Sequence, residues 1–145
     1  MELSYYGICI KIALDDEKVK EVSLSEEKIA RSVSYKELLE YRLNCSGLTA
    51  FECAVFEKTR EIPEGKVASY RDVARRVGKP NSARAVGAAL AKNPFLIIVP
   101  CHRVVMSDMS IGGFSKGKLL KRRLLEREGI EFERGRVKEG FIFKW

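Results

Sequence analysis

The sequence predicts an α+β protein: a small N-terminal α/β lobe with a short antiparallel sheet, then a mainly helical lobe containing a winged-helix-like helix-turn-helix. Apolar and polar residues alternate over 7–14, as in a strand with one buried face. After residue 48, helix-start patterns and apolar residues at helical spacing take over. We place the boundary at residues 44–47, so the expected domains are 1–47 and 48–145.

The N-terminal lobe is expected to hold two strands and one short helix. The alternating apolar residues of the first strand share one face: Ile8, Ile10, Ile12 and Leu14. The acidic segment 15–18 is typical of a turn, and 20–24 forms the returning strand. A Ser-Tyr-Lys-Glu capping box at 34–37 opens a helix that we expect to continue through Tyr41. Asn-Cys-Ser-Gly at 44–47 then interrupts the pattern.

Three helices are expected in the first part of the second lobe. Capping boxes at 49–52 and 69–72 begin two of them, and Gly78 suits the left-handed end of the second. Ser82 is expected to cap a third helix over 83–92. Two short helices joined by a turn rich in Gly and Pro are typical of a helix-turn-helix.

The remaining elements follow the apolar segment 95–99, which is expected to be buried. The glycine-rich loop at 111–117 lacks the spacing of a phosphate-binding P-loop, which argues against nucleotide binding. A basic helix is expected over 118–128, with its leucines inward: Leu119, Leu120, Leu124 and Leu125. Segments 130–132 and 141–143 could pair as a terminal hairpin.

Charge is distributed unevenly along the 145 residues, whose net charge is +7. Residues 1–48 carry a balance of −2 and residues 49–145 a balance of +9. A basic excess confined to one part of the chain indicates a polyanionic partner, although a generally basic protein with solvated lysines is the plainer alternative. Because no apolar stretch is long enough for a membrane span and no signal peptide is recognisable, we expect a cytoplasmic protein without a membrane partner.

The four cysteines show no CxxC spacing, and a single histidine does not complete a usual zinc site. We therefore predict no metal and no cofactor. In a reducing compartment, Cys9, Cys45 and Cys53 are most simply small core residues.

Cys101 stands apart from the other cysteines because it precedes His102, the single histidine, at the end of the buried segment. Only the thiolate of a cysteine is nucleophilic, and histidine is the side chain whose ordinary pKa lies near neutrality. The pair therefore suggests an activated nucleophile, against the alternative of an inert buried cysteine beside a surface histidine. The helix expected over 83–92 consists almost entirely of small residues, with Arg84 as its one long side chain in the first two turns. Such a helix suits close approach to a nucleic-acid groove or tight packing in a core.

Together these motifs resemble the O6-alkylguanine-DNA alkyltransferases. The Pro-Cys-His-Arg-Val-Val motif at 100–105 carries the resemblance, together with Ser-Ala-Arg-Ala-Val-Gly-Ala-Ala at 82–89 and Asn-Pro at 93–94. Further matching segments lie at 48–51, 62–70, 112–115 and 128–129. The resemblance covers about two thirds of the chain, and the first 45 or so residues match only as a short α/β lobe.

The resemblance implies DNA repair by direct reversal: Cys101 takes the alkyl group from O6 of a guanine that has been flipped out of the duplex. His102 would act on the thiol through a water, and Glu128 would orient His102. Asn93 would brace the turn behind the cysteine. The product is a thioether that no group in the sequence regenerates, so one event per molecule is expected.

The implied partner is double-stranded DNA that contains O6-alkylguanine, bound by a monomer in the minor groove with little sequence specificity. Arg84 would enter the base stack and Tyr70 would promote rotation of the nucleotide, while the small faces of Ala83 and Gly87 would lie in the groove. The DNA backbone would be contacted by Arg71, Lys79 and Ser107. The flipped base would be held by Tyr70, Leu90, Val104, Phe114 and Ser115.

Two departures from the family pattern bear on specificity. Phe114 replaces a frequent Tyr, so a hydroxyl near the base is missing and substrate affinity or alkyl preference is expected to differ. Lys116 replaces a frequent Gly and is expected to narrow or charge the mouth of the pocket, so bulky benzyl-type adducts should be accepted poorly. Two other functions remain open. An alkyltransferase-like lesion-binding protein would lack the acceptor thiol, and a winged-helix regulator would need neither Cys101 nor His102.

Overall fold

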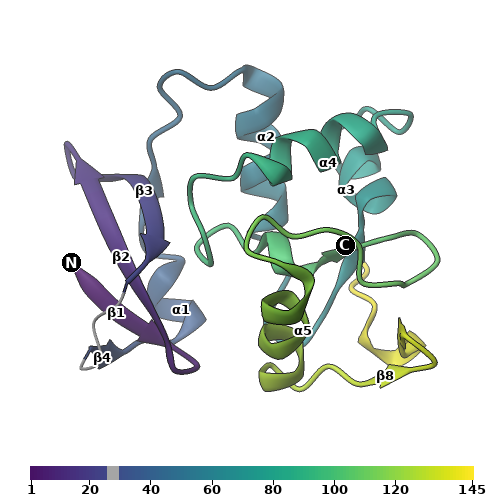
Figure 1. The fold of residues 1–145 in the computed structure, drawn as a ribbon. Helices are drawn as coiled ribbons and strands as arrows, with labels where there is room; N and C mark the ends of the chain where they lie inside the picture. The colour runs from purple at the N-terminus through teal and green to yellow at the C-terminus, as the bar shows by residue number, and fades with distance from the viewer. Residues whose placement is uncertain (26–29) are drawn as a thin grey trace.

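The computed structural model describes residues 1–25 and 30–145, and its N-terminal lobe is built on a five-stranded sheet. The strand order is β4-β1-β2-β3-β5, with the three central strands antiparallel and the two short edge strands parallel to their neighbours. Figure 1 shows this sheet on one side of the molecule and the helices α2 to α5 on the other. The strands are β1 (Glu2–Tyr5), β2 (Ile8–Asp15), β3 (Lys18–Leu24), β4 (Arg31–Ser32) and β5 (Arg42–Leu43).

The predicted hairpin of β2 and β3 is confirmed, but strand β1 was missing from the prediction. A tight turn joins β1 to β2, with Tyr6 at φ 48° and Gly7 at φ 77°, values that suit a two-residue hairpin. The prediction that Leu14 faces inward is wrong, because its side chain is 48% exposed. A shift of register between Ala13 and Leu14 breaks the alternation there.

Helix α1 (Tyr35–Leu38) begins with the predicted capping box at Ser34 but ends three residues before the predicted Tyr41. The chain leaves the helix early because Arg42 and Leu43 pair with the start of β3. The end of α1 is therefore set by strand pairing between β5 and β3 and not by a signal within the helix.

Cys45 and Cys53 form a disulfide, which corrects the prediction of free core cysteines. Their Cα atoms lie 5.9 Å apart, and eight positions separate them in the chain. The bond ties the segment between the lobes to the first turns of α2 (Ala50–Thr59). Cys9 and Cys101 remain as free thiols in the described part of the chain.

The predicted helix-turn-helix is formed by α3 (Tyr70–Arg76) and α4 (Ala83–Ala91). Capping boxes are present at the starts of α2 and α3, as predicted. Ser82 does not cap α4 through its side chain. Its backbone, at φ −106° and ψ 26°, lies outside the extended region that a capping residue usually adopts.

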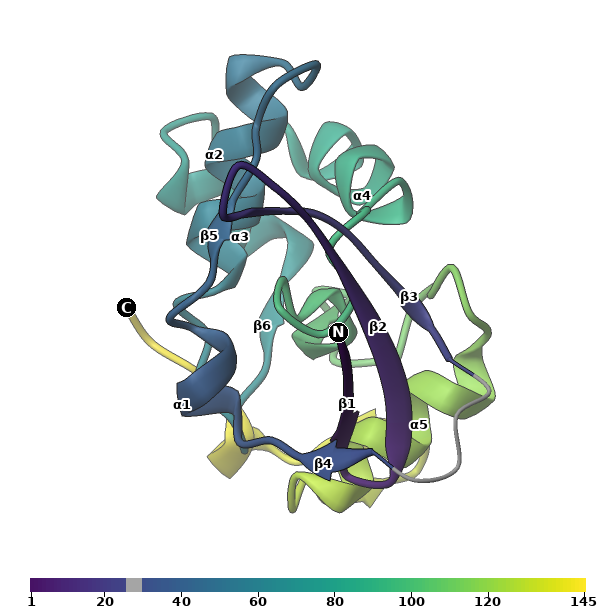
Figure 2. The same cartoon turned by 90° about the vertical axis from the view of Figure 1, so that its left-hand side faces the viewer.

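One hydrophobic core includes residues of both lobes, from the inner face of the sheet to helix α5. The segment 95–99 is buried as predicted and passes between the two lobes as irregular chain. It leads into a 3₁₀ turn, Cys101–Arg103, and then into β7 (Val104–Val105), which pairs in parallel with β6 (Ala68–Ser69). Figure 2 shows the sheet lying across this segment.

Helix α5 (Lys118–Arg127) differs from the prediction in which side chains face inward. Leu119 is 66% exposed, whereas Lys121 is fully buried. The ammonium of Lys121 donates to the carbonyl oxygens of Val104, at 2.6 Å, and Gly113, at 3.0 Å. Lys121 therefore holds the glycine-rich loop against the strand that follows Cys101.

The C-terminal prediction of a hairpin between 130–132 and 141–143 is wrong. Strand β8 (Phe132–Glu133) instead pairs with β9 (Arg136–Val137) across a tight turn. A 3₁₀ turn, Glu139–Phe141, follows, and the chain then bonds to Val67 at the start of the β6 segment. Within the described residues, no helix combines the length and apolar character that crossing a membrane requires.

Removing the disulfide should lower stability. We expect the double variant Cys45→Ser/Cys53→Ser to lose about 2–3 kcal/mol of unfolding free energy, measured by denaturant titration, because the unfolded chain gains loop freedom. Thiol titration of the unfolded, unreduced protein should find two of the four cysteines reactive. Cys9→Ser is the matched control and should leave the unfolding midpoint almost unchanged. Four reactive thiols would contradict the disulfide.

Replacing Lys121 should destabilise the protein far more than replacing an exposed cation of the same helix. Lys121→Met leaves two carbonyl oxygens without their donor, so we expect a loss of about 1–3 kcal/mol. Arg123→Met, on the exposed side of α5, should change the unfolding free energy by less than about 0.5 kcal/mol. Equal losses in urea titrations of the two variants would refute the role of the buried ammonium.

Candidate active site

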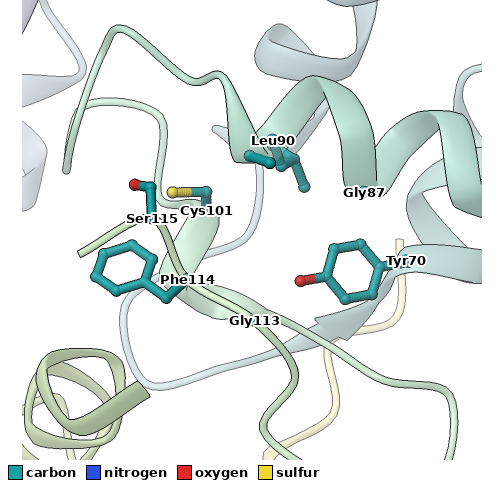
Figure 3. Close-up of a pocket in the computed structure, with 8 residues that line it drawn as sticks. Tyr70, Gly87, Leu90, Cys101, Gly113, Phe114 and Ser115 are labelled. Carbon is teal, nitrogen blue, oxygen red and sulfur yellow. The ribbon is translucent and has the colours of Figure 1, made fainter. Parts of the chain in front are cut away.

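A cavity of about 240 Å³ opens beside Cys101, between helix α4 and the glycine-rich loop. Figure 3 shows the thiol at the side of this cavity, with the Phe114 ring on one side and the Tyr70 hydroxyl pointing in from the other. The lining consists of Tyr70, Gly87, Leu90, Ala91, Cys101, Gly113, Phe114 and Ser115. A single thiol therefore lies in a mostly apolar cavity that also contains the hydroxyl groups of Tyr70 and Ser115.

Asn93 contacts both the buried Cys101 and the chain that precedes it. The side-chain amide of Asn93 donates to the sulfur at 3.3 Å and to the Val99 carbonyl at 3.0 Å. Its oxygen accepts from the backbone N–H of Phe95 at 2.9 Å. Burial raises the pKa of the Cys101 thiol, opposed by the Asn93 bond and the Lys121 charge. The sulfur is therefore a protonated thiol at neutral pH and needs a base before it reacts.

His102 lies next to the thiol in the chain and is fully buried. Its Nε2 atom lies 2.5 Å from a carboxylate oxygen of Glu128. Burial lowers the pKa of His102, although the charge of Glu128 opposes this shift. A neutral ring must then carry its proton on Nε2, facing Glu128. Nδ1 is buried and without a hydrogen-bond partner in the described part of the chain, so it is the atom available to accept a proton.

Arg103 keeps Glu128 ionised, and sequence reasoning did not assign it a role. The guanidinium is fully buried and donates from Nε to Oε2 of Glu128 at 2.8 Å and from Nη2 to Oε1 at 3.0 Å. Burial alone would raise the pKa of Glu128, but His102 and Arg103 together lower it to about 2. The signal in the sequence was an Arg placed between Cys-His and two valines, where a charge is buried only with a partner.

The N-terminal lobe also contacts this ion pair. The Arg103 guanidinium lies 3.9 Å from the centre of the Tyr35 ring, in a cation–π contact. Its Nη1 donates to the Ile62 carbonyl at 2.9 Å, and its Nη2 donates to the Tyr5 hydroxyl at 3.0 Å. Neither tyrosine was predicted to belong to the site.

The residues expected to contact DNA gather on an adjoining hollow of about 320 Å³. Its lining includes six of those expected residues and two others: Tyr70, Arg71, Ala83, Arg84, Gly87, Met106, Ser107 and Gly113. Tyr70, Gly87 and Gly113 line both cavities. Lys79 is exposed in the turn between α3 and α4, outside the hollow.

Two expectations about the base pocket differ from the structure. Val104 is fully buried and does not line the cavity, and its carbonyl oxygen already accepts from Lys121. Lys116 is exposed and is not among the residues that line the cavity. Leu90, Phe114 and Ser115 do line it.

Comparison with known proteins agrees with this geometry. Residues 50–130 match the family described as 6-O-methylguanine DNA methyltransferase, DNA binding domain. The methylated-DNA--protein-cysteine methyltransferase of Saccharolobus solfataricus is 51% identical over 81 residues, which are 56% of this chain and 52% of that protein. The matched segment thus spans about half the length of such relatives.

Two solved structures extend the similarity. The OGT of Mycobacterium tuberculosis in complex with DNA superposes with a TM-score of 0.68 at 27% identity, covering 88% of this chain and 90% of that one. The Atl1 protein of S. pombe, in complex with damaged DNA containing O6-carboxymethylguanine, gives 0.58 at 36% identity, covering 65% and 94%. Because the family match covers more than half of the sequence and includes Cys101, His102 and Glu128, the chain belongs to the 6-O-methylguanine DNA methyltransferase family.

Proposed function

We propose that the protein repairs DNA by transferring the alkyl group of O6-alkylguanine, foremost a methyl group, to its own Cys101. The observation that carries this proposal is the buried thiol in a mostly apolar cavity, backed by a histidine whose free nitrogen can accept a proton. The relatives named as methylated-DNA–protein-cysteine methyltransferases support the same reaction.

The reaction begins with loss of the thiol proton. Nδ1 of His102 takes the proton, directly or through a water, while Glu128 stabilises the imidazolium through Nε2. The sulfur anion attacks the alkyl carbon, an S–C bond forms, and the bond between that carbon and O6 breaks. The electron pair leaves with the guanine, which regains a proton from the imidazolium. No group of the protein converts the resulting thioether back to a thiol, so each molecule acts once.

The target base must leave the duplex, because O6 is out of reach of a buried thiol while the base is stacked. We assign α4 to the minor groove, where Ala83 and Gly87 permit close approach and sequence is read weakly. Exposed Arg84 would fill the space left in the stack, and Tyr70 would crowd the nucleotide toward the cavity. Arg71, Lys79 and Ser107 would contact the DNA backbone.

An alternative is a lesion-binding protein that transfers nothing. It is favoured by the similarity to Atl1, which is described in complex with damaged DNA. Cys101 distinguishes the two functions, since a protein that only binds a lesion needs no acceptor thiol. A winged-helix regulator is a weaker alternative, because nothing in such a role calls for the His102–Glu128 pair behind the cavity.

The proposed function also includes a division of the chain into two domains and an expected setting in the cell. We assign residues 1–47 to an N-terminal lobe and 48–145 to the DNA-binding and alkyl-acceptor domain. We also propose that the protein acts as a monomer in the cytoplasm, on double-stranded DNA, without a metal or cofactor.

The transfer should appear as a covalent mass increase. After incubation with a duplex that contains O6-methylguanine, intact-mass spectrometry should show one methyl group per protein, located at Cys101 by peptide mapping. Cys101→Ala should gain nothing and still bind the duplex. Cys9→Ser, which removes the other free thiol, should react like the unaltered protein. A wild-type protein that binds the lesion without gaining mass would favour the Atl1-like function.

Arg84 should matter for base flipping rather than for the chemistry. We expect Arg84→Ala to slow single-turnover transfer from duplex DNA at least about tenfold, because extrusion costs a few kcal/mol. Transfer from the free base O6-methylguanine should change little, since nothing has to be flipped. Arg71→Ala should weaken duplex binding and its salt dependence but not the rate at saturation. Equal slowing on both substrates would refute the proposal that Arg84 fills the space left by the flipped base.

A further inference from the structure

Tyr5 reaches the acceptor site from the N-terminal lobe, outside the segment that the family match covers. Its side chain is 1% exposed, and strand β1 places it on the inner face of the sheet. Tyr6, in the turn that follows Tyr5, is hydrogen-bonded to two residues of the second lobe. Arg127 of α5 donates to the Tyr6 carbonyl, and the Tyr6 hydroxyl donates to Glu64. The phenol of Tyr5 is therefore held in a defined position beside Glu128, the residue that contacts His102.

The Tyr5 hydroxyl touches three charged groups. Its oxygen accepts from Nη2 of Arg103 at 3.0 Å. It lies 3.2 Å from Oε1 of Glu128, the oxygen that also faces Nε2 of His102, and 3.1 Å from Oε1 of Glu64. Burial, followed by the nearby charge of Glu128, raises the pKa of Tyr5 above its ordinary value. The phenol therefore keeps its proton at neutral pH.

A phenol carries one proton, so Tyr5 donates to one carboxylate at a time. The two acceptors are almost equally distant, and they differ in position: Glu128 is 8% exposed, and Glu64 lies on an exposed loop. When the proton points to Glu128, it withdraws charge from the oxygen that binds His102. When it points to Glu64, Glu128 keeps that charge for the imidazole.

We propose that Tyr5 is a positioning residue of the acceptor site, whose hydroxyl, shared between Glu64 and Glu128, sets the proton affinity of His102. The N-terminal lobe would thereby tune the base that activates Cys101. The proposal rests on the proposed function only in the role of His102 as that base. The coupling between Tyr5 and His102 itself is a property of the free protein.

The sign of the effect follows from the charges around the imidazole. The groups that face it are Glu128 on one side, with Arg103 and Lys121 as nearby cations. Removing the Tyr5 hydroxyl takes a donor from Glu128 and leaves more negative charge beside Nε2. Negative charge favours the imidazolium, so the pKa of His102 should rise. Removing the competing acceptor at Glu64 should direct the proton to Glu128 and lower that pKa.

His102 is the single histidine, so one NMR signal of histidine-labelled protein reports its titration. In Tyr5→Phe we expect its pKa to rise by about half a pH unit or more. Tyr6→Phe is the matched control, because its hydroxyl contacts Glu64 without touching Glu128, and its shift should be less than half as large. In the same variants, the pH profile of single-turnover transfer should move with the NMR titration.

A double-mutant cycle separates the hydrogen bond from the charge of Glu64. Glu64→Ala should lower the pKa of His102 in the unaltered protein and have a much smaller effect when Tyr5 is already Phe. An unchanged titration in Tyr5→Phe, or equal shifts from Glu64→Ala in both backgrounds, overturns the proposal. If Tyr5→Phe does not fold, Glu64→Gln replaces it, because the amide removes the charge and keeps an acceptor for Tyr5. Glu64→Ala should then lower the pKa of His102 more than Glu64→Gln does, and equal shifts reject the proposal.

The titration of His102 tests the Tyr5 coupling separately from the proposed methyl transfer. A shifted titration without methyl transfer to Cys101 would leave the Tyr5 coupling in place and remove the proposed function. Methyl transfer with an unshifted titration would do the reverse.

Discussion

The ion pair between Arg103 and Glu128 is the interaction on which the rest of the site depends. Both side chains are buried, and an unpaired charge in such a place would cost several kcal/mol. The buried guanidinium therefore needs acceptors, and each of its three nitrogens has one, on Glu128, the Ile62 carbonyl or Tyr5. Segments far apart in the chain must converge for Arg103 to be buried at all.

The same pair determines what His102 does. An ionised Glu128 holds the proton of a neutral imidazole on Nε2, which leaves Nδ1 as the basic atom. Burial keeps the Cys101 thiol protonated and the His102 ring neutral, so the proposed reaction requires a proton to leave the thiol before the sulfur attacks. A thiol that stays protonated until then suits the proposed single transfer, because a permanently ionised thiol would be open to oxidation and to other electrophiles.

Much of the architecture was predictable because its signals are local. Capping boxes at Ser34, Thr49 and Ser69 mark helix starts by a pattern of four residues, and all three are present. The hairpin of β2 and β3 followed from its alternation and its acidic turn. Helix ends and inward faces were less predictable. Helix α1 stops where a strand pairing begins, and α5 is rotated so that Lys121, rather than Leu119, points inward.

The sequence by itself determined the family and singled out Cys101, the adjacent His102 and the small-residue helix as candidates for the site, because each depends on residue types at fixed spacing. Only the tertiary structure revealed the Cys45–Cys53 bond and the roles of Arg103, Lys121 and Tyr5. Tyr5 and Glu128 are 123 positions apart, and no local pattern encodes that contact. The physical reason is that a buried charge must be neutralised by whichever groups the fold brings to it, and those groups can come from anywhere in the chain.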